Sequence, residues 1–312
     1  MTLKYFFLLI PLLVSLACAE KKVTESPREP ATFPIRFAAP GGELDTGLDM
    51  LYVRSPWNKD QYMALDLPEH CWGKNFSGLS TDARGPARPN RWQFNGDSTR
   101  AVYTLTAQDG SIFRARAQAD SMAVELSIEI ENRSALPITD IRVLVCTRPN
   151  GMTAFRDTNF VQTEVAVEGR PLRLGRETHF SGTPPERLPP AWVMNIRGGI
   201  DNRTVDDMGW FSADWGRRQF RLVEEEAEPA LIGIHAAGDE ERWLATLWEP
   251  SRVLFSNPHI PCIHSDPVPP DCPPGETTRA VGIVFFHHGT FQSLIALAEA
   301  WRAGQRKKLA GG

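Results

Sequence analysis

Hydrophobic and polar residues alternate in short runs along most of the chain, which is the pattern of antiparallel β-strands. In Met122–Glu131, apolar residues occupy the even positions from 124 to 130 and polar residues the odd positions. This alternation predicts one buried and one solvent-facing side. Ala101–Ala107 and Ile112–Ala117 alternate in the same way around Gly110, whose freedom to adopt a positive φ suits a tight turn. We therefore predict a three-stranded meander in this region.

Similar runs continue downstream, separated by Gly, Pro, Asn and Asp. Burying so many half-apolar strands requires two packed sheets. The predicted fold class is therefore all-β, a large antiparallel two-sheet sandwich. The further predicted strands are Ile138–Cys146, Phe160–Val167, Ala191–Ile196, Arg218–Val223, Ala230–His235, Trp243–Trp248, Val253–Ser256 and Thr277–Phe286.

One segment near the C-terminal end has helical periodicity, and Thr290 is placed to cap it. An amphipathic helix over residues 289–304 is predicted to pack on the sandwich. The expected organisation is a signal peptide (1–19), a flexible tether (20–33), the sandwich domain (34–288), this helix and a tail (305–312). The apolar residues on one face of the helix are Phe291, Leu294, Ile295, Ala298 and Trp301.

The N-terminal residues are typical of a signal peptide, because Lys4 precedes an apolar run, Tyr5–Leu16, that is too short to span a bilayer. Two cleavage sites are compatible with the small residues that follow. Ala17-Cys18-Ala19 fits ordinary signal peptidase, whereas Ser15–Cys18 resembles a lipobox, which would place a lipid anchor on Cys18. Either alternative predicts an extracytoplasmic protein, periplasmic or at the cell surface, that is lipid-anchored or secreted. Contact with a membrane is expected only through that anchor.

The chain carries a mild net charge of -4, and its arginines are scattered, so nucleic acid is not an expected partner. If Cys18 is lipidated or removed, four cysteines remain for disulfides in an oxidising compartment. Of their three possible pairings we favour Cys71 with Cys146 and Cys262 with Cys272. Zinc binding by these thiols is disfavoured, since no CxxC spacing occurs.

The densest polar cluster lies in Asn257–Pro267, which we predict to be a rigid, proline-rich loop. His259, His264 and Asp266 in this segment could serve as ligands of a divalent metal or as an acid/base pair. The alternative is a structural loop whose histidines bond backbone carbonyls. Glu249, which follows Trp248, is a further acid/base candidate.

Nine tryptophans are many for a chain of 312 residues, and several lie in polar surroundings. Exposed aromatic faces beside hydrogen-bonding groups suit sugar rings, whose faces are apolar and whose edges are polar. The alternative is that most of these tryptophans fill the core. The candidate carbohydrate contacts are Trp72, Arg91, Trp92, Trp210 and Trp215.

The passage Glu129–Ser134, followed by Leu136-Pro137 and the strand Ile141–Cys146, resembles the apolar strand, Asn-x-Ser turn and apolar strand of galactose-mutarotase-like sandwiches. The resemblance extends over residues 34–288. It implies carbohydrate chemistry, since aldose epimerases, accessory domains of glycoside hydrolases and polysaccharide lyases share this fold. The epimerases use a histidine acid and a glutamate base, but their His-Pro-aromatic-aromatic string is not found here.

Two functions remain open from the sequence. The first is an exported carbohydrate-handling protein acting on glycan as an epimerase, lyase or hydrolase. The second is a non-catalytic surface lipoprotein that binds glycan or a partner protein. An enzyme requires titratable groups that converge in a cleft, whereas a binding protein requires only an aromatic platform.

Overall fold

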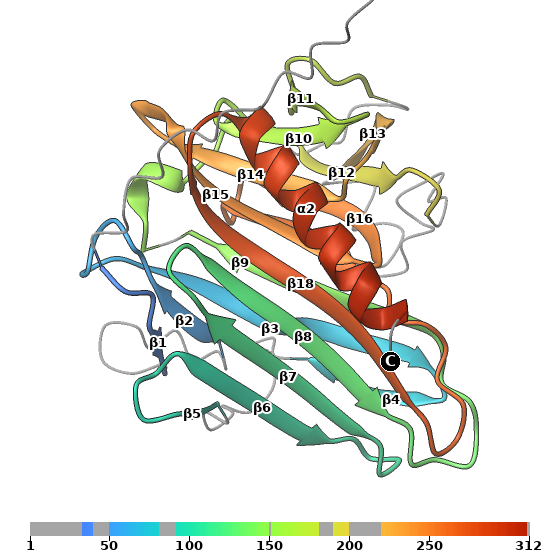
Figure 1. Ribbon diagram of the computed structural model, residues 1–312. Helices are drawn as coiled ribbons and strands as arrows, with labels where there is room; N and C mark the ends of the chain where they lie inside the picture. Colours follow the sequence, from blue (N-terminus) through green and yellow to red (C-terminus); the bar gives the residue numbers. More distant parts are fainter. Residues whose placement is uncertain are drawn as a thin grey trace, which may run out of the picture.

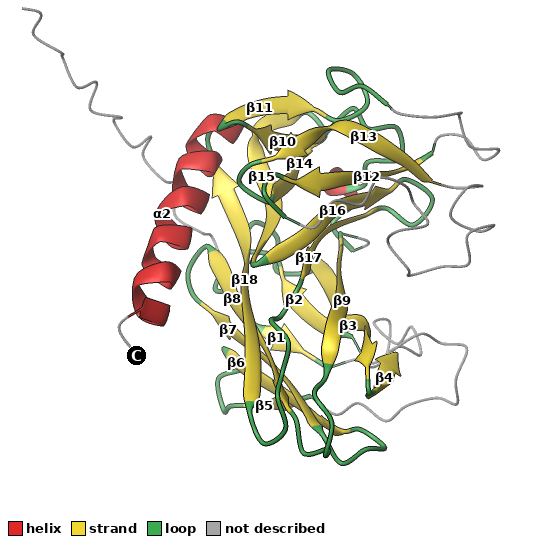
Figure 2. Ribbon diagram, turned by 90° about the vertical axis from the view of Figure 1, so that its right-hand side faces the viewer, coloured by secondary structure: helices red, strands yellow, loops and turns green. Residues whose placement is uncertain are grey.

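The computed structural model describes residues 33–39, 50–80, 92–149, 151–180, 190–199 and 220–310. Within them, two nine-stranded sheets pack face to face, and a helix lies across the outside of one sheet (Figures 1 and 2). The predicted two-sheet sandwich with a C-terminal helix is confirmed. One neighbouring pair, β12 and β13, runs parallel. None of the helices in this part of the chain is long and apolar enough to cross a membrane.

The two sheets are called sheet A and sheet B. In spatial order, sheet A consists of β1 (Phe37–Ala38), β2 (Leu51–Arg54), β3 (Tyr62–Lys74), β9 (Thr139–Arg148), β17 (Cys262–Pro267), β16 (Ser251–Asn257), β12 (Ala191–Ile196) and β13 (Phe220–Ala227), with β4 (Phe76–Ser80) paired to β3. Sheet B consists of β11 (Arg170–Arg173), β10 (Thr163–Val167), β14 (Leu231–Ala236), β15 (Asp239–Glu249), β18 (Thr277–His288), β8 (Ala123–Glu131), β7 (Ile112–Ala119), β6 (Arg100–Thr106) and β5 (Gln93–Phe94). A short 3-10 helix, η2, covers Thr153–Phe155.

The predicted meander is β6–β7–β8, and its register joins Thr106 to Ile112 across the turn. Gly110 adopts a φ of 85° there, as the turn requires. The even positions of β8 from 124 to 130 are buried in the core between the sheets, whereas Glu125 is exposed. The alternation thus places one side of each strand in the core and leaves the other on the outer face.

The segment predicted as a loop, Asn257–Pro267, is instead a β-hairpin, and this prediction was wrong. A turn over residues 258–261 leads into β17, which lies inside sheet A between β16 and β9. Ile263 and Ser265 face inward, whereas Cys262, His264 and Asp266 face outward. The alternation was hidden because its polar members are buried as well: His264 is 1% and Asp266 0% exposed.

Neither predicted disulfide is formed, because the two cysteines of each predicted pair lie in different regions of the protein. All four cysteines in the described residues are free and buried. Cys71 and Cys272 belong to the core between the sheets. Cys146 and Cys262 belong to a separate cluster on the outer face of sheet A. A disulfide requires Cα atoms within about 7 Å, so these packing positions disfavour both predicted bridges.

The helix α2 (Phe291–Ala310) covers the half of sheet B that runs from β10 to β18. The predicted N-cap is confirmed, since the Thr290 hydroxyl accepts the amide of Ser293 at 3.1 Å. The helix continues beyond residue 304, and two arginines of its later turns bond Glu249 at the end of β15. Arg302 donates to Glu249 at 2.8 Å, and Arg306 donates to it at 3.0 Å.

Candidate functional site

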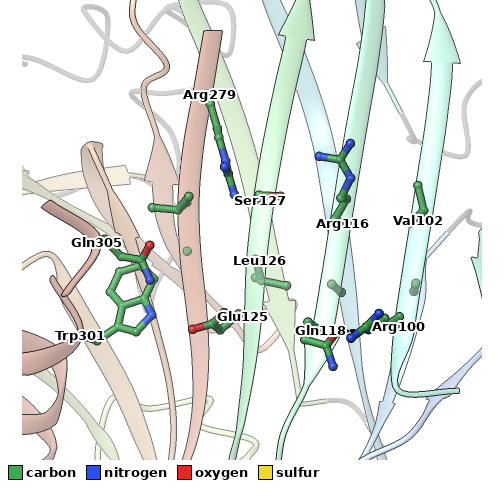
Figure 3. A pocket seen from close by; sticks show the side chains of 14 residues that line it. Arg100, Val102, Arg116, Gln118, Glu125, Leu126, Ser127, Arg279, Trp301 and Gln305 are labelled. Carbon is green, nitrogen blue, oxygen red and sulfur yellow. Dashed lines mark hydrogen bonds between the residues drawn. The ribbon is translucent and has the colours of Figure 1, made fainter. Parts of the chain in front are cut away.

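The outer face of sheet B carries an open groove of about 340 Å³ beside α2 (Figure 3). Its floor comes from β6, β7, β8 and β18, and its wall from the later turns of α2. Among the described residues, the helix packs on the strands from β10 to β18, and the apolar cluster beneath it contains no residue of β7 or β6. The groove therefore forms at the step between the covered and uncovered halves of the sheet.

Strand register explains the shape of the floor. One row across the sheet contains the successive partners Val102, Arg116, Ser127 and Val281. Ser127 and Val281 have short side chains and are almost fully buried. Arg116 rises beside them, and its side chain is 44% exposed. The short side chains beside the long Arg116 side chain thus leave a depression in the outer face of sheet B.

The adjacent row adds hydrogen-bonding groups. Arg100, Gln118 and Glu125 are successive partners on β6, β7 and β8. The Arg100 guanidinium donates to the Gln118 side-chain oxygen at 2.5 Å, and this partner is neutral. Figure 3 shows these side chains along one end of the groove. The row offers amide, carboxylate and guanidinium groups to a ligand.

The lining of the groove is positively charged, although the chain as a whole is acidic. Arg100, Arg116 and Arg279 line it against one glutamate, Glu125. Glu129 beside the groove is 2.5 Å from Arg116 and 4.0 Å from Arg279, so one carboxylate serves two guanidiniums. Clustered charge of one sign attracts ligands of the opposite sign.

The helix contributes an aromatic wall. Trp301 is half-buried, packing partly on the apolar cluster beneath α2 and partly lining the groove. Gln305 follows one turn later and adds an amide. Figure 3 shows both side chains on the helix side, across β18 from Glu125. The groove thus combines an aromatic surface with polar groups on the facing side.

The outer face of sheet A carries a buried group of thiols and an imidazole, here called the thiol–imidazole cluster. It consists of Cys146 from β9 with Cys262 and His264 from β17, and their potential ligand atoms lie within 4.8 Å of one another. The pairing of Ile263 with Thr147 places Cys146 opposite His264. Cys262 Sγ is 3.3 Å from His264 Nε2. Two strands distant in sequence therefore bring three soft or borderline ligands together.

Charged side chains surround this cluster. His264 Nδ1 is 3.3 Å from Asp266 Oδ1, which also accepts the amide of Val145 at 2.9 Å. Arg148 lies 3.1 Å from the Cys146 sulfur, and its guanidinium bonds the carboxylates of Asp66 and Glu69. The Arg148 side chain is only 12% exposed, so these charges interact with little screening by water.

Burial controls the protonation of the cluster. It raises the pKa of Cys146 well above the usual thiol value, and a hydrogen bond to Cys262 adds to this effect. Burial also raises the pKa of Asp266. For His264, burial lowers the pKa, but the charges of Cys146 and Asp266 outweigh it, so the pKa is raised. A thiol nucleophile requires a low pKa, so this environment does not favour nucleophilic catalysis.

The structure brings together two of the predicted catalytic residues, His264 and Asp266, and places the others elsewhere. His259 lies in the turn before β17 and is not part of the thiol–imidazole cluster. Glu249 forms ion pairs with Arg302 and Arg306 of α2, and these ion pairs link the helix to the end of β15. Trp92 is 6% exposed and packs against Tyr103 in the core.

Of the remaining predicted site residues, one lies in the described part of the chain and the others lie outside it. Trp72 lies on β3, partly exposed, with its ring edge-on to His70 and ring centroids 6.0 Å apart. Arg91, Trp210, Trp215 and Cys18 lie outside the residues that the structure describes.

Sequence analysis missed the groove residues altogether. Arg116 was treated only as a member of an alternating strand, Arg100 and Gln118 lay just outside the predicted strands, and Trp301 was treated only as part of the packed helix face. The available signal was the repeated arginine on the polar side of neighbouring strands. That signal becomes informative only once the register brings these positions side by side.

Comparisons with known proteins give distant structural likenesses. No protein-family model and no curated protein matches the chain. A polysaccharide lyase is similar over 83% of this chain and 33% of its own, with 12% identity and a TM-score of 0.35. The Slr1438 protein from Synechocystis sp. PCC 6803 is similar over 82% and 96%, with 9% identity and a TM-score of 0.37.

A provisionally assigned aldose 1-epimerase from Klebsiella pneumoniae is similar over 82% of this chain and 58% of its own, with 9% identity and a TM-score of 0.30. The chain spans about a third of the lyase's length and somewhat more than half of the epimerase's. A function for this protein therefore has to come from its own residues.

Proposed function

We propose that this protein handles carbohydrate by binding an acidic oligosaccharide in the groove between α2 and the uncovered half of sheet B. The observation that carries the proposal is the lining, in which three arginines and a tryptophan surround a floor of small residues. Guanidinium groups bind carboxylates through paired hydrogen bonds, and aromatic surfaces pack on the apolar faces of sugars. The volume is at the lower end of small-ligand sites, which run from about 300 to 1,000 Å³.

The groove has the chemistry of recognition rather than of bond cleavage. Its described lining includes one carboxylate, Glu125, and no histidine or tyrosine. Glycosidases generally require two carboxyl groups flanking the scissile bond, and elimination requires a base such as histidine or tyrosine. These residues therefore support a binding protein.

We place this binding outside the cytoplasm. The support is the N-terminal pattern, in which Lys4 and the apolar run Tyr5–Leu16 precede small residues. A lipid on Cys18 would hold the sandwich at a membrane surface, whereas ordinary cleavage would release it. Mass spectrometry of the protein expressed in a bacterial host and purified from both the membrane and the soluble extracytoplasmic fractions distinguishes the two, because diacylation adds the mass of the lipid to the mature N-terminal cysteine.

Calorimetric titration tests the binding proposal with uronate oligosaccharides and neutral oligosaccharides of equal length. We expect the uronates to bind more tightly and to lose affinity as salt rises. The variants Arg100→Gln and Arg116→Gln should each weaken uronate binding by about tenfold, because a charge-assisted hydrogen bond contributes roughly 1.4 kcal/mol or more.

The matched control is Arg170→Gln, which changes an arginine on β11 whose side chain is 72% exposed and which does not line the groove. It should leave binding unchanged. Equal affinity for neutral and acidic sugars, or unchanged binding in both groove variants, would contradict the proposal.

A further inference from the structure

We infer that the thiol–imidazole cluster of sheet A is a zinc site, with Cys146, Cys262 and His264 as ligands. The site lies on the opposite sheet from the groove and does not depend on the proposed function. Two cysteines and one histidine form a common zinc-binding set, in which the fourth position is filled by water or another ligand. The inference rests on the arrangement of these ligands, their supporting contacts and their charge.

The ligand spacing fits a tetrahedral ion after small side-chain rotations. Zinc–sulfur and zinc–nitrogen bonds of about 2.3 and 2.0 Å place sulfur and nitrogen roughly 3.5 Å apart at a tetrahedral angle. Cys262 Sγ and His264 Nε2 are already 3.3 Å apart. The widest separation within the cluster is at most 4.8 Å, so closure around the ion requires movements of about 1 Å.

A carboxylate supports the imidazole from its other side. Metal-bound histidines generally donate their second ring N–H to a carboxylate or carbonyl, which fixes the ring and its tautomer. His264 presents Nε2 to the thiols, and its Nδ1 is 3.3 Å from Asp266 Oδ1. Asp266 is itself fixed by the amide of Val145. The arrangement therefore has the supporting carboxylate of a metal-binding histidine.

Charge balance also favours an ion. Two thiolates would place two negative charges in a buried site, and a divalent ion neutralises them. Arg148, 3.1 Å from Cys146, further stabilises a thiolate. Asp266 Oδ2 is buried and has no hydrogen-bond partner among the described residues. A cation bound to the imidazole would offset its charge.

Thiolate and imidazole donors select soft or borderline ions, and the three-ligand set with an open position suits zinc. The competing outcome for two neighbouring thiols in an oxidising compartment is a Cys146–Cys262 disulfide, which would remove both ligands. Elemental analysis and mass spectrometry of the same sample separate these outcomes.

The test uses the full chain, reduced, supplied with zinc and freed of loosely bound metal by gel filtration. We expect one zinc per chain by elemental analysis. Cobalt in place of zinc should give the intense near-ultraviolet band of a cobalt–thiolate bond and the visible bands of a tetrahedral site. The Cys146→Ser and Cys262→Ser variants should lose both signals, whereas Cys272→Ser, which changes a buried thiol outside the cluster, should keep them.

Asp266→Asn separates a positioning role from general misfolding. It retains the size of the side chain, and we expect zinc affinity, measured against a coloured chelator, to fall about 10- to 100-fold. Far-ultraviolet circular dichroism and the midpoint of urea unfolding report whether each variant is folded. A folded, reduced wild-type chain that takes up no zinc would overturn the inference, as would a Cys146–Cys262 disulfide in the protein isolated from its compartment.

Discussion

The outer faces of the two sheets carry the same types of residue in opposite surroundings. In the groove of sheet B, the side chains of Arg116 and Arg279 are 44% and 51% exposed. On sheet A, Arg148 is 12% exposed, and its partner Asp66 is 2% exposed. Water screens the charges of Arg116 and Arg279 and is largely excluded from the ion pair of Arg148 with Asp66. The difference shows that burial, more than residue type, decides whether an arginine is available to a ligand or fixed to its neighbours.

The largest expected effect is the loss of the buried ion pairs around Arg148. Arg148→Met would leave the Asp66 carboxylate buried without its guanidinium partner, and breaking such a pair costs about 3–5 kcal/mol. Urea unfolding followed by circular dichroism measures this loss in the free energy of unfolding.

Arg116→Met is the matched variant on sheet B. Its ion pair with Glu129 is largely solvated, so the free energy of unfolding should change by only about 0–1 kcal/mol. Equal destabilisation by Arg148→Met and Arg116→Met would break the comparison between the two faces.

A smaller effect is expected from the aromatic wall. Trp301→Ala should weaken uronate binding about 2- to 10-fold, since an aromatic contact contributes roughly 0.5–1.5 kcal/mol beyond area burial. Calorimetric titration measures the change. Trp301→Phe retains an aromatic surface and should recover much of the affinity, and zinc content should be the same in all three proteins. A loss of zinc together with uronate binding would indicate general unfolding of the variant, because the zinc ligands lie on the opposite sheet from α2.

The smallest effect is expected from the single carboxylate of the groove. Glu125→Gln removes a negative charge from a site proposed for acidic sugars, so uronate affinity should rise about two- to threefold at low salt. The gain should disappear at high salt, where exposed charges are screened. Affinity for a neutral oligosaccharide should not change. A fall in uronate affinity would show that Glu125 bonds the ligand instead.

Predictions from the sequence were most accurate where the alternation of residue types follows directly from the burial of hydrophobic side chains. In β8, every apolar even position from 124 to 130 is buried, because these side chains are hydrophobic and face the core. Gly110 marked the turn before β7 for an equally local reason. The helix cap at Thr290 likewise depends only on neighbouring residues. Local patterns therefore predicted the meander, the helix and the sandwich class.

Prediction failed where burial did not follow hydrophobicity. Residues 262–267 alternate between inward and outward positions, but their outward members are cysteine, histidine and aspartate, so the segment resembled a polar loop. The disulfide pairs were chosen by sequence spacing, which carries no information about the face of a sheet. Cys262 and Cys146 meet only because β17 lies beside β9.

The groove was hidden for a third reason, because no single segment contains it. Its floor requires the register of four strands, and its wall requires the place where α2 crosses them. Arg100 and Arg279 are far apart in sequence, and their proximity is a property of the topology. A shape made by a helix covering half of a sheet has no signature in a local pattern.

The position of β18 has a consequence for the order in which this protein folds. β18 lies between β8 and β15, so sheet B is one continuous sheet only after residues 277–288 have joined it. Before that step, β8 and β15 present unpaired edges that can pair with other chains. β8 ends at residue 131 and β18 begins at residue 277, so this non-local pairing is expected to form more slowly than the local meander. Until the last strand arrives, these two edges are therefore the places in sheet B where association with other chains is expected.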